Sequence, residues 1–189
     1  MKSNTMGMDQ LTLSITYSVI IPHWNTPDLL MRCLESIPVR EDIQVIVVDD
    51  QSPGNEEYAE KYPMLSRPYL TYISAPRKGG AGYARNLGMK EAVGKWLLFA
   101  DADDFFLPGA FDVFDSHQDS SSEIVYFRTK GVQSEDTTKP SQRFSWLDDL
   151  FKEYFETGDE WILRCHHETP HPKMFLRAFV EETMMCISA

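Results

Sequence analysis

The chain has 189 residues, enough for one globular domain with at most a small appendage. Its 42% hydrophobic and 25% charged residues are typical of a soluble fold, and its net charge of -11 argues against nucleic-acid binding, which needs clustered Lys and Arg. No apolar run approaches the roughly 20 residues that span a bilayer, and the N-terminus does not resemble a signal peptide. The three widely spaced cysteines favour reduced thiols. We therefore expect a cytoplasmic protein, with peripheral association at the inner membrane face left open.

Short apolar runs rich in β-branched residues alternate with amphipathic segments through the first half of the chain. Each apolar run predicts a buried strand, and each amphipathic segment predicts a helix. The predicted strands cover residues 17–22, 43–50, 69–74 and 95–100. The predicted helices cover residues 27–37, 55–62 and 79–93. This alternation indicates βαβ units, and hence an α/β fold with a mostly parallel sheet.

The pattern loosens after Pro108. Helices are expected at 109–117 and 144–157, a strand at 123–129, a polar loop at 131–143, and a turn followed by a helix at 166–189. Four aromatic residues of this half are expected to pack in the core rather than to form a sugar platform. They are Trp146, Phe151, Phe155 and Trp161.

Polar or glycine-rich residues follow the predicted strands, where ligands of parallel sheets bind. Asp49 and Asp50 end the second strand, and their carboxylates could accept hydrogen bonds from a nucleobase or a ribose. Helix capping or simple solvation explains that pair equally well. Arg77 and Lys78 precede a glycine-rich helix start that could hold a diphosphate, although solvated cations beside a flexible loop are the simpler explanation.

Three carboxylates follow the fourth predicted strand in the sequence DADD, at Asp101, Asp103 and Asp104. Like charges this close repel unless a cation or hydrogen bonds offset them. Hard oxygen ligands suit Mg²⁺ or Mn²⁺, which share their remaining coordination positions with water and substrate phosphates. An acidic turn that caps the next helix is the alternative interpretation.

These blocks, in this order, resemble the nucleotide-sugar-binding half of the family 2 glycosyltransferases, which have a GT-A fold. The resemblance runs from about Tyr17 to Phe114 through SVIIPHWN, VIVVDDQS, GGAGYARNLGMKEAVGKWLLFADADD and FLPGAF. The later HPKMFLRAFVEE is similar to a helix that many members carry behind the donor site. The resemblance implies a Rossmann-like, three-layer α/β/α arrangement. It also implies an N-terminal extension at 1–16, a donor-binding core at 17–129, and an acceptor-side helical segment, cut short, at 130–189.

The resemblance also implies a role for individual residues. Asp50 would contact the nucleobase, which Pro22 and Trp24 would flank, and a Trp face can stack on a base. Asp101 would approach the ribose, and Asp103 would coordinate Mn²⁺ or Mg²⁺, with Asp104 in a supporting or turn-capping role. The expected nucleotide-sugar site comprises Pro22, Trp24, Asn25, Asp50, Arg85, Asp101 and Ala102.

The function implied by the resemblance is inverting, metal-dependent transfer of a sugar from a nucleotide-diphospho-sugar, with a UDP-sugar favoured, to a saccharide or glycoconjugate acceptor. Inversion needs a general base, which the family carries after the segment that resembles KMFLRAF; here only VEETMMCISA follows, and we assign no base. His167 and Glu168 are the remaining candidates, against a polar loop at the cleft rim. A donor-binding module without turnover therefore stays open. A nucleotidyltransferase is disfavoured because no glycine-rich, cation-bearing loop directly follows the first strand.

Overall fold

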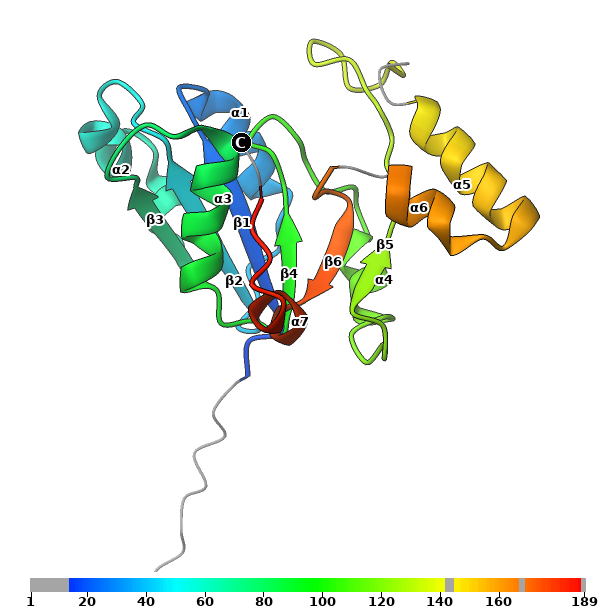
Figure 1. The fold of residues 1–189 in the computed structure, drawn as a ribbon. Helices are drawn as coiled ribbons and strands as arrows, with labels where there is room; N and C mark the ends of the chain where they lie inside the picture. The colour runs from blue at the N-terminus through cyan, green and yellow to red at the C-terminus, as the bar shows by residue number, and fades with distance from the viewer. Residues whose placement is uncertain (1–13, 142–144, 167–168, 188–189) are drawn as a thin grey trace, which may run out of the picture.

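The computed structural model describes residues 14–141, 145–166 and 169–187, and it contains one six-stranded sheet (Figure 1). The strands are β1 (Tyr17–His23), β2 (Ile43–Asp49), β3 (Leu70–Ser74), β4 (Trp96–Phe99), β5 (Ile124–Tyr126) and β6 (Lys173–Leu176). Their order is β3-β2-β1-β4-β6-β5. The first four strands in this order are parallel, and β6 runs antiparallel to both of its neighbours. The expected α/β fold with a mostly parallel sheet is confirmed.

Helices cover both faces of the sheet and so make the expected three layers. The helices are α1 (Pro27–Glu35), α2 (Tyr58–Lys61), α3 (Gly80–Glu91), α4 (Ala110–Asp115), α5 (Ser145–Thr157), α6 (Glu160–His166) and α7 (Arg177–Glu182). Two 3₁₀ helices, η1 (Asn55–Glu57) and η2 (Pro63–Ser66), flank α2. Buried side chains of α1, α2 and α4 form one apolar core against the sheet, and those of α3 and α7 form a second core on the opposite face (Figure 1).

The central strands are apolar at nearly every position because both of their faces are covered. In β1, Val19 and Ile21 point into the core with α1, whereas Ile20 points into the core with α3. β2 alternates in the same way, with Val47 in the first core and Val48 in the second. Asp49 is the last residue of β2 and Asp50 follows it directly, so their side chains also face opposite layers.

Helix α3 lies very close to β1 because a glycine faces the strand. A Cβ atom built on Gly88 would lie 2.5 Å from Cγ2 of Ile20 and 3.4 Å from Cγ2 of Val48. At the start of α3, the backbone N–H groups of Gly79 and Gly80 donate to Asp50, so this end of the helix lies at the carboxyl end of β2.

The segment HPKMFLRAFVEE corrects the expectation of a single helix. Lys173–Leu176 forms strand β6, and only Arg177–Glu182 is helical. β6 pairs with β4 on one side and β5 on the other, and it buries Met174 in the first core and Phe175 in the second. A short apolar run buried on two faces has no period that separates strand from helix, so the sequence pattern could not reveal it. The core sheet therefore includes a strand from the segment 130–189.

The aromatic residues of α5 and α6 are only partly in the core. Phe151 is buried as expected, but Phe155 and Trp161 are 71% and 68% exposed, and Trp146 is 39% exposed. The expectation of core packing is wrong for these three because α5 and α6 pack on each other beyond the β5 edge of the sheet (Figure 1). Within the described ranges, the chain contains no helix that is both long enough and apolar enough to cross a bilayer.

Replacing Gly88 with alanine tests the contact between α3 and β1. Alanine raises helix propensity by about 1 kcal/mol, but its Cβ meets Ile20, and such overpacking costs about 1–3 kcal/mol. We expect Gly88→Ala to lower the free energy of unfolding in urea, whereas Lys90→Ala, at an exposed position of the same helix, leaves it nearly unchanged. A Gly88→Ala protein that is as stable as the wild type would contradict the close packing.

Candidate functional site

A cleft of about 480 Å³ lies at the carboxyl ends of the parallel strands. β1 is central in the order, with β2 on one side and β4 on the other, and such a switch point in strand order is where open α/β sheets bind ligands. The expected site residues that line this cleft are Pro22, Trp24, Asp50, Arg85, Asp101, Ala102 and Asp103. Asn25 does not line the cleft; it lies on the same turn as Trp24 and has a positive φ of 53°.

Asp49 is an internal anchor rather than a cleft residue. Its side chain is fully buried, and Oδ1 lies 2.9 Å from Nδ1 of His23, its partner across the β1–β2 pairing. Ser52 donates to the carboxylate through its backbone N–H and its hydroxyl, and Asn55 Nδ2 donates to Oδ2. Burial alone would raise the pKa of Asp49, but these hydrogen bonds outweigh it and lower the pKa to about 2.

Asp50 faces the opposite layer and holds the glycine-rich loop. Its two carboxylate oxygens accept hydrogen bonds from the backbone N–H groups of Gly79 and Gly80, at 2.7 and 2.8 Å. Gly80 has a φ of 80°, which a residue with a side chain rarely adopts. The carboxylate thus fixes the start of α3, and it lines the cleft with acceptor capacity left over. The contact of Asp50 with a nucleobase stays a prediction.

A contact between a cation and an aromatic ring joins the loop after β1 to the loop before α3. Nζ of Lys78 lies 3.8 Å from the centre of the Trp24 ring, and both residues line the cleft. Trp24 is 48% exposed, so part of the residue remains in contact with solvent. A cation over an indole face is attracted by the ring electrons, which holds the two loops together.

Arg85 and Asp101 place opposite charges in the cleft between α3 and β4. Nη2 of Arg85 forms an ion pair with Oδ1 of Asp101. The arginine is 8% exposed, and its buried Nε has no hydrogen-bond partner among the described residues. Arg85 therefore retains donor capacity for an anionic ligand.

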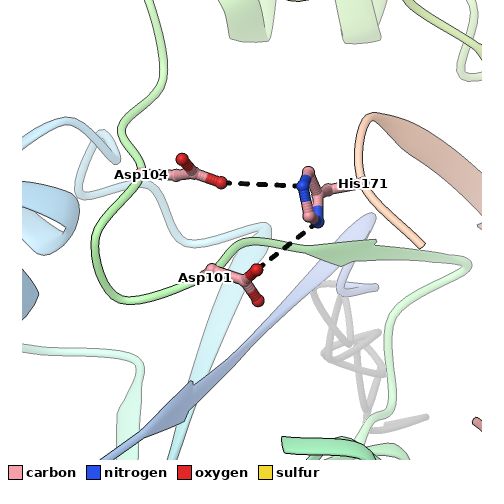
Figure 2. A group of neighbouring side chains, drawn as sticks. All are labelled: Asp101, Asp104 and His171. Atoms are coloured by element: carbon pink, nitrogen blue, oxygen red, sulfur yellow. Dashed lines mark ion pairs between the residues drawn. The ribbon is translucent and has the colours of Figure 1, made fainter. Parts of the chain in front are cut away.

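The acidic turn after β4 gathers a histidine from a distant segment (Figure 2). Nδ1 of His171 lies 3.8 Å from Oδ2 of Asp101, and its Nε2 lies 3.8 Å from Oδ2 of Asp104. Burial raises the pKa of the Asp104 carboxyl, a shift that His171 opposes and that Asp101 and Asp103 reinforce. One ligand atom from each of Asp101, Asp104 and His171 lies within 4.8 Å of the others. This donor set has the spacing to surround a divalent cation.

Asp103 has a different environment from its two neighbours. Its side chain is exposed in the cleft wall, outside the group formed with His171, while its backbone carbonyl accepts a hydrogen bond from Nη2 of Arg32 on α1. The Arg32 guanidinium also lies 5.2 Å from the centre of the Phe105 ring. Arg32 therefore fixes the backbone of the acidic turn, and the metal role of Asp103 stays a prediction.

The sequence does not predict the partners of two histidines at this site. The partners of His171 lie about 70 positions away, and the β4–β6 pairing that brings them together has no signal in the sequence pattern. His23 is the last residue of β1, a position that is consistent with a buried partner but does not identify it. The candidates His167 and Glu168 lie outside the described residues.

Comparison with known proteins gives the family. A family model of glycosyl transferase family 2 matches residues 18–184. The minor teichoic acid biosynthesis protein GgaB of Bacillus subtilis (strain 168) is 35% identical over 124 residues, a match that covers 59% of this chain and 13% of GgaB. The poly(ribitol-phosphate) beta-N-acetylglucosaminyltransferase TarS of Staphylococcus aureus (strain Mu50 / ATCC 700699) is 30% identical over 125 residues, which covers 61% of this chain and 21% of TarS.

A solved structure shows the same fold. The crystal structure of S. aureus TarS 1-349 superposes with a TM-score of 0.65 at 24% identity and covers 90% of this chain and 50% of that chain. Structures of the same TarS fragment have also been solved in complex with UDP and with UDP-GlcNAc. The chain therefore spans about half of the solved TarS fragment and a smaller share of the curated relatives it matches.

The hydrogen bonds of Asp49 generate a prediction on stability. Because the pKa falls from 3.8 to about 2 on folding, the ionised carboxylate contributes about 2 kcal/mol, a contribution fully present above pH 4 and lost as the pH falls through 2. We expect Asp49→Asn to lower the free energy of unfolding at pH 7 by at least this amount, and the difference from wild type to shrink between pH 4 and pH 2. Denaturant unfolding of both proteins across this pH range measures the difference in the free energy of unfolding.

The control is Asp149→Asn, an exposed position on α5, which should leave the unfolding curve unchanged at every pH. A stability difference between Asp49→Asn and wild type that stays constant from pH 7 to pH 2 would contradict the lowered pKa.

Proposed function

This chain belongs to glycosyl transferase family 2, and we propose that it binds a nucleotide-diphospho-sugar, with a UDP-sugar favoured, and transfers the sugar to a saccharide or glycoconjugate acceptor. The observation that carries the proposal is the convergence of residues from four separate segments, after β1, β2 and β4 and at the start of α3, on one cleft. The UDP complexes of TarS and the sequence similarity to TarS support a uridine donor. The names of GgaB and TarS support an acceptor of the teichoic acid or cell-surface polysaccharide type.

The cleft offers a distinct environment to each part of such a donor. The partly exposed Trp24 would stack on the base, with Pro22 on the same loop, and Asp50, which also lines the cleft, would accept hydrogen bonds from the base. Asp101 would accept hydrogen bonds from the ribose. Lys78 and Arg85 supply positive charge for an anionic diphosphate on either side of the start of α3.

The residues present fit a divalent cation, Mn²⁺ or Mg²⁺. Asp101 and Asp104 provide hard oxygen ligands beside His171, whose Nδ1 is buried with no hydrogen-bond partner among the described residues. Asp103 would add a further carboxylate from the cleft wall. When bound, the cation would neutralise the charge that develops on the leaving nucleoside diphosphate. Arg85 holds the Asp101 carboxylate, and Arg32 holds the backbone of the turn at Asp103, so the Asp101 carboxylate is oriented before a donor arrives.

A donor-binding role without turnover is the second candidate, and one observation favours it. The carboxylates that line the cleft are Asp50, Asp101 and Asp103, and each has a role toward the donor in the proposal above. Among the lining residues no carboxylate remains to deprotonate an acceptor hydroxyl. Release of UDP from a UDP-sugar in the presence of an acceptor distinguishes transfer from binding alone.

Calorimetric titration of UDP, GDP and their sugars, each with and without Mn²⁺, tests the donor site. We expect UDP to bind at least about tenfold more tightly with Mn²⁺, because the cation offsets the repulsion between the diphosphate and the acidic turn. Asp103→Asn should remove the effect of Mn²⁺ and leave the weak metal-free binding in place. Asp149→Asn on α5 is the matched control and should bind as the wild type does. A folded protein that binds none of these nucleotides would contradict the assignment of the cleft as a donor site.

A further inference from the structure

The turn that follows β1 carries Trp24 between two anchored residues. The side chain of His23 is fully buried, Trp24 is 48% exposed, and Asn25 adopts a positive φ of 53°. Asn is among the residue types that adopt this left-handed region most readily, so it can form the sharp turn that the surrounding hydrogen bonds then hold in place. The orientation of the indole depends on those hydrogen bonds, because the ring itself is only partly packed.

The hydrogen bonds of His23 define its tautomer. The backbone N–H of Thr26 donates to Nε2 at 3.2 Å, so Nε2 carries no hydrogen. Nδ1 therefore carries the hydrogen and donates it to Oδ1 of Asp49 at 2.9 Å. The ring also packs against Tyr58, with 5.8 Å between the ring centres. The imidazole thus bridges the end of β2 and the far side of the turn, and it can occupy only one orientation.

A second path from Asp49 reaches the same turn. The Ser52 hydroxyl donates to Oδ1 of Asp49 at 2.5 Å and accepts the backbone N–H of Asn25 at 2.7 Å. The residues on both sides of Trp24 are therefore tied to one buried carboxylate, through His23 on one side and through Ser52 and Asn25 on the other. This closed ring of hydrogen bonds determines where the indole stands in the cleft wall.

We propose that His23 is a positioning residue for the nucleobase of the donor: it acts through the turn 23–26 to hold the indole of Trp24 against the base. The inference rests on the proposed function, because it needs a base in the cleft. A buried histidine with a purely structural role would instead contribute to stability alone, with no specific link between His23 and Trp24.

A double-mutant cycle on UDP affinity separates these two roles. His23→Asn retains a donor to Asp49 but removes the acceptor for the Thr26 amide, and Trp24→Ala removes the stacking face. We expect Trp24→Ala to weaken UDP binding about tenfold, in line with base stacking elsewhere, and His23→Asn to weaken it several-fold. In the Trp24→Ala background, His23→Asn should then have no further effect. His117→Asn, at an exposed histidine, is the control.

The binding of Mn²⁺-pyrophosphate provides a second measurement. Pyrophosphate has no base, so His23→Asn should leave its affinity unchanged while UDP binding falls. Equal losses for UDP and pyrophosphate, or a His23→Asn effect that persists in full without Trp24, would overturn the proposal.

If His23→Asn does not fold, the same cycle with Ser52→Ala tests the proposal, because that variant breaks the second path to the turn. A wild-type protein that binds no UDP would overturn the proposed function and this inference together, whereas wild-type binding with additive losses overturns this inference alone.

Discussion

Two adjacent carboxylates at the end of β2 hold the two walls of the cleft, and the rest of the site depends on them. Successive side chains of a strand point to opposite faces, so Asp49 faces the α1 layer and Asp50 the α3 layer. Asp49 binds His23 and Ser52 and fixes the turn with Trp24; Asp50 binds the amides of the loop that follows Lys78. The contact between Lys78 and Trp24 then joins the two walls.

The charge of the protein sets the second constraint. The proposed donor is anionic, and long-range attraction cannot help a chain with a net charge of -11 to bind it. Local groups would have to supply the attraction: Arg85, Lys78 and a cation among the carboxylates after β4. A cation reverses the effect of the acidic turn, because carboxylates that would repel a diphosphate instead hold the charge that binds it.

The sequence was sufficient to predict the parallel strands, their carboxyl-end loops and most of the residues that line the cleft. Buried strands have continuous apolar runs. The polar residues that end those runs lie at the carboxyl ends of the strands, where the cleft forms. The roles of neighbouring residues were harder to predict. Asp49 and Asp50 are identical in type, and only the three-dimensional partners show that one is enclosed by hydrogen bonds and the other reaches the cleft. The exposure of Trp161 likewise depends on where α5 and α6 pack, which the helical period does not specify.

The antiparallel strand β6 links the later part of the chain to the proposed cation site. Because β6 lies between β4 and β5, its pairing with β4 brings His171, two residues before β6, to the carboxyl end of β4, beside Asp101 and Asp104. An isolated segment of residues 17–129 would retain the three carboxylates of the acidic turn but would lack this nitrogen and the strand that covers β4. The proposed site is consequently not contained in the βαβ units that resemble the family most clearly, since the position of one of its polar groups depends on a strand added from beyond them.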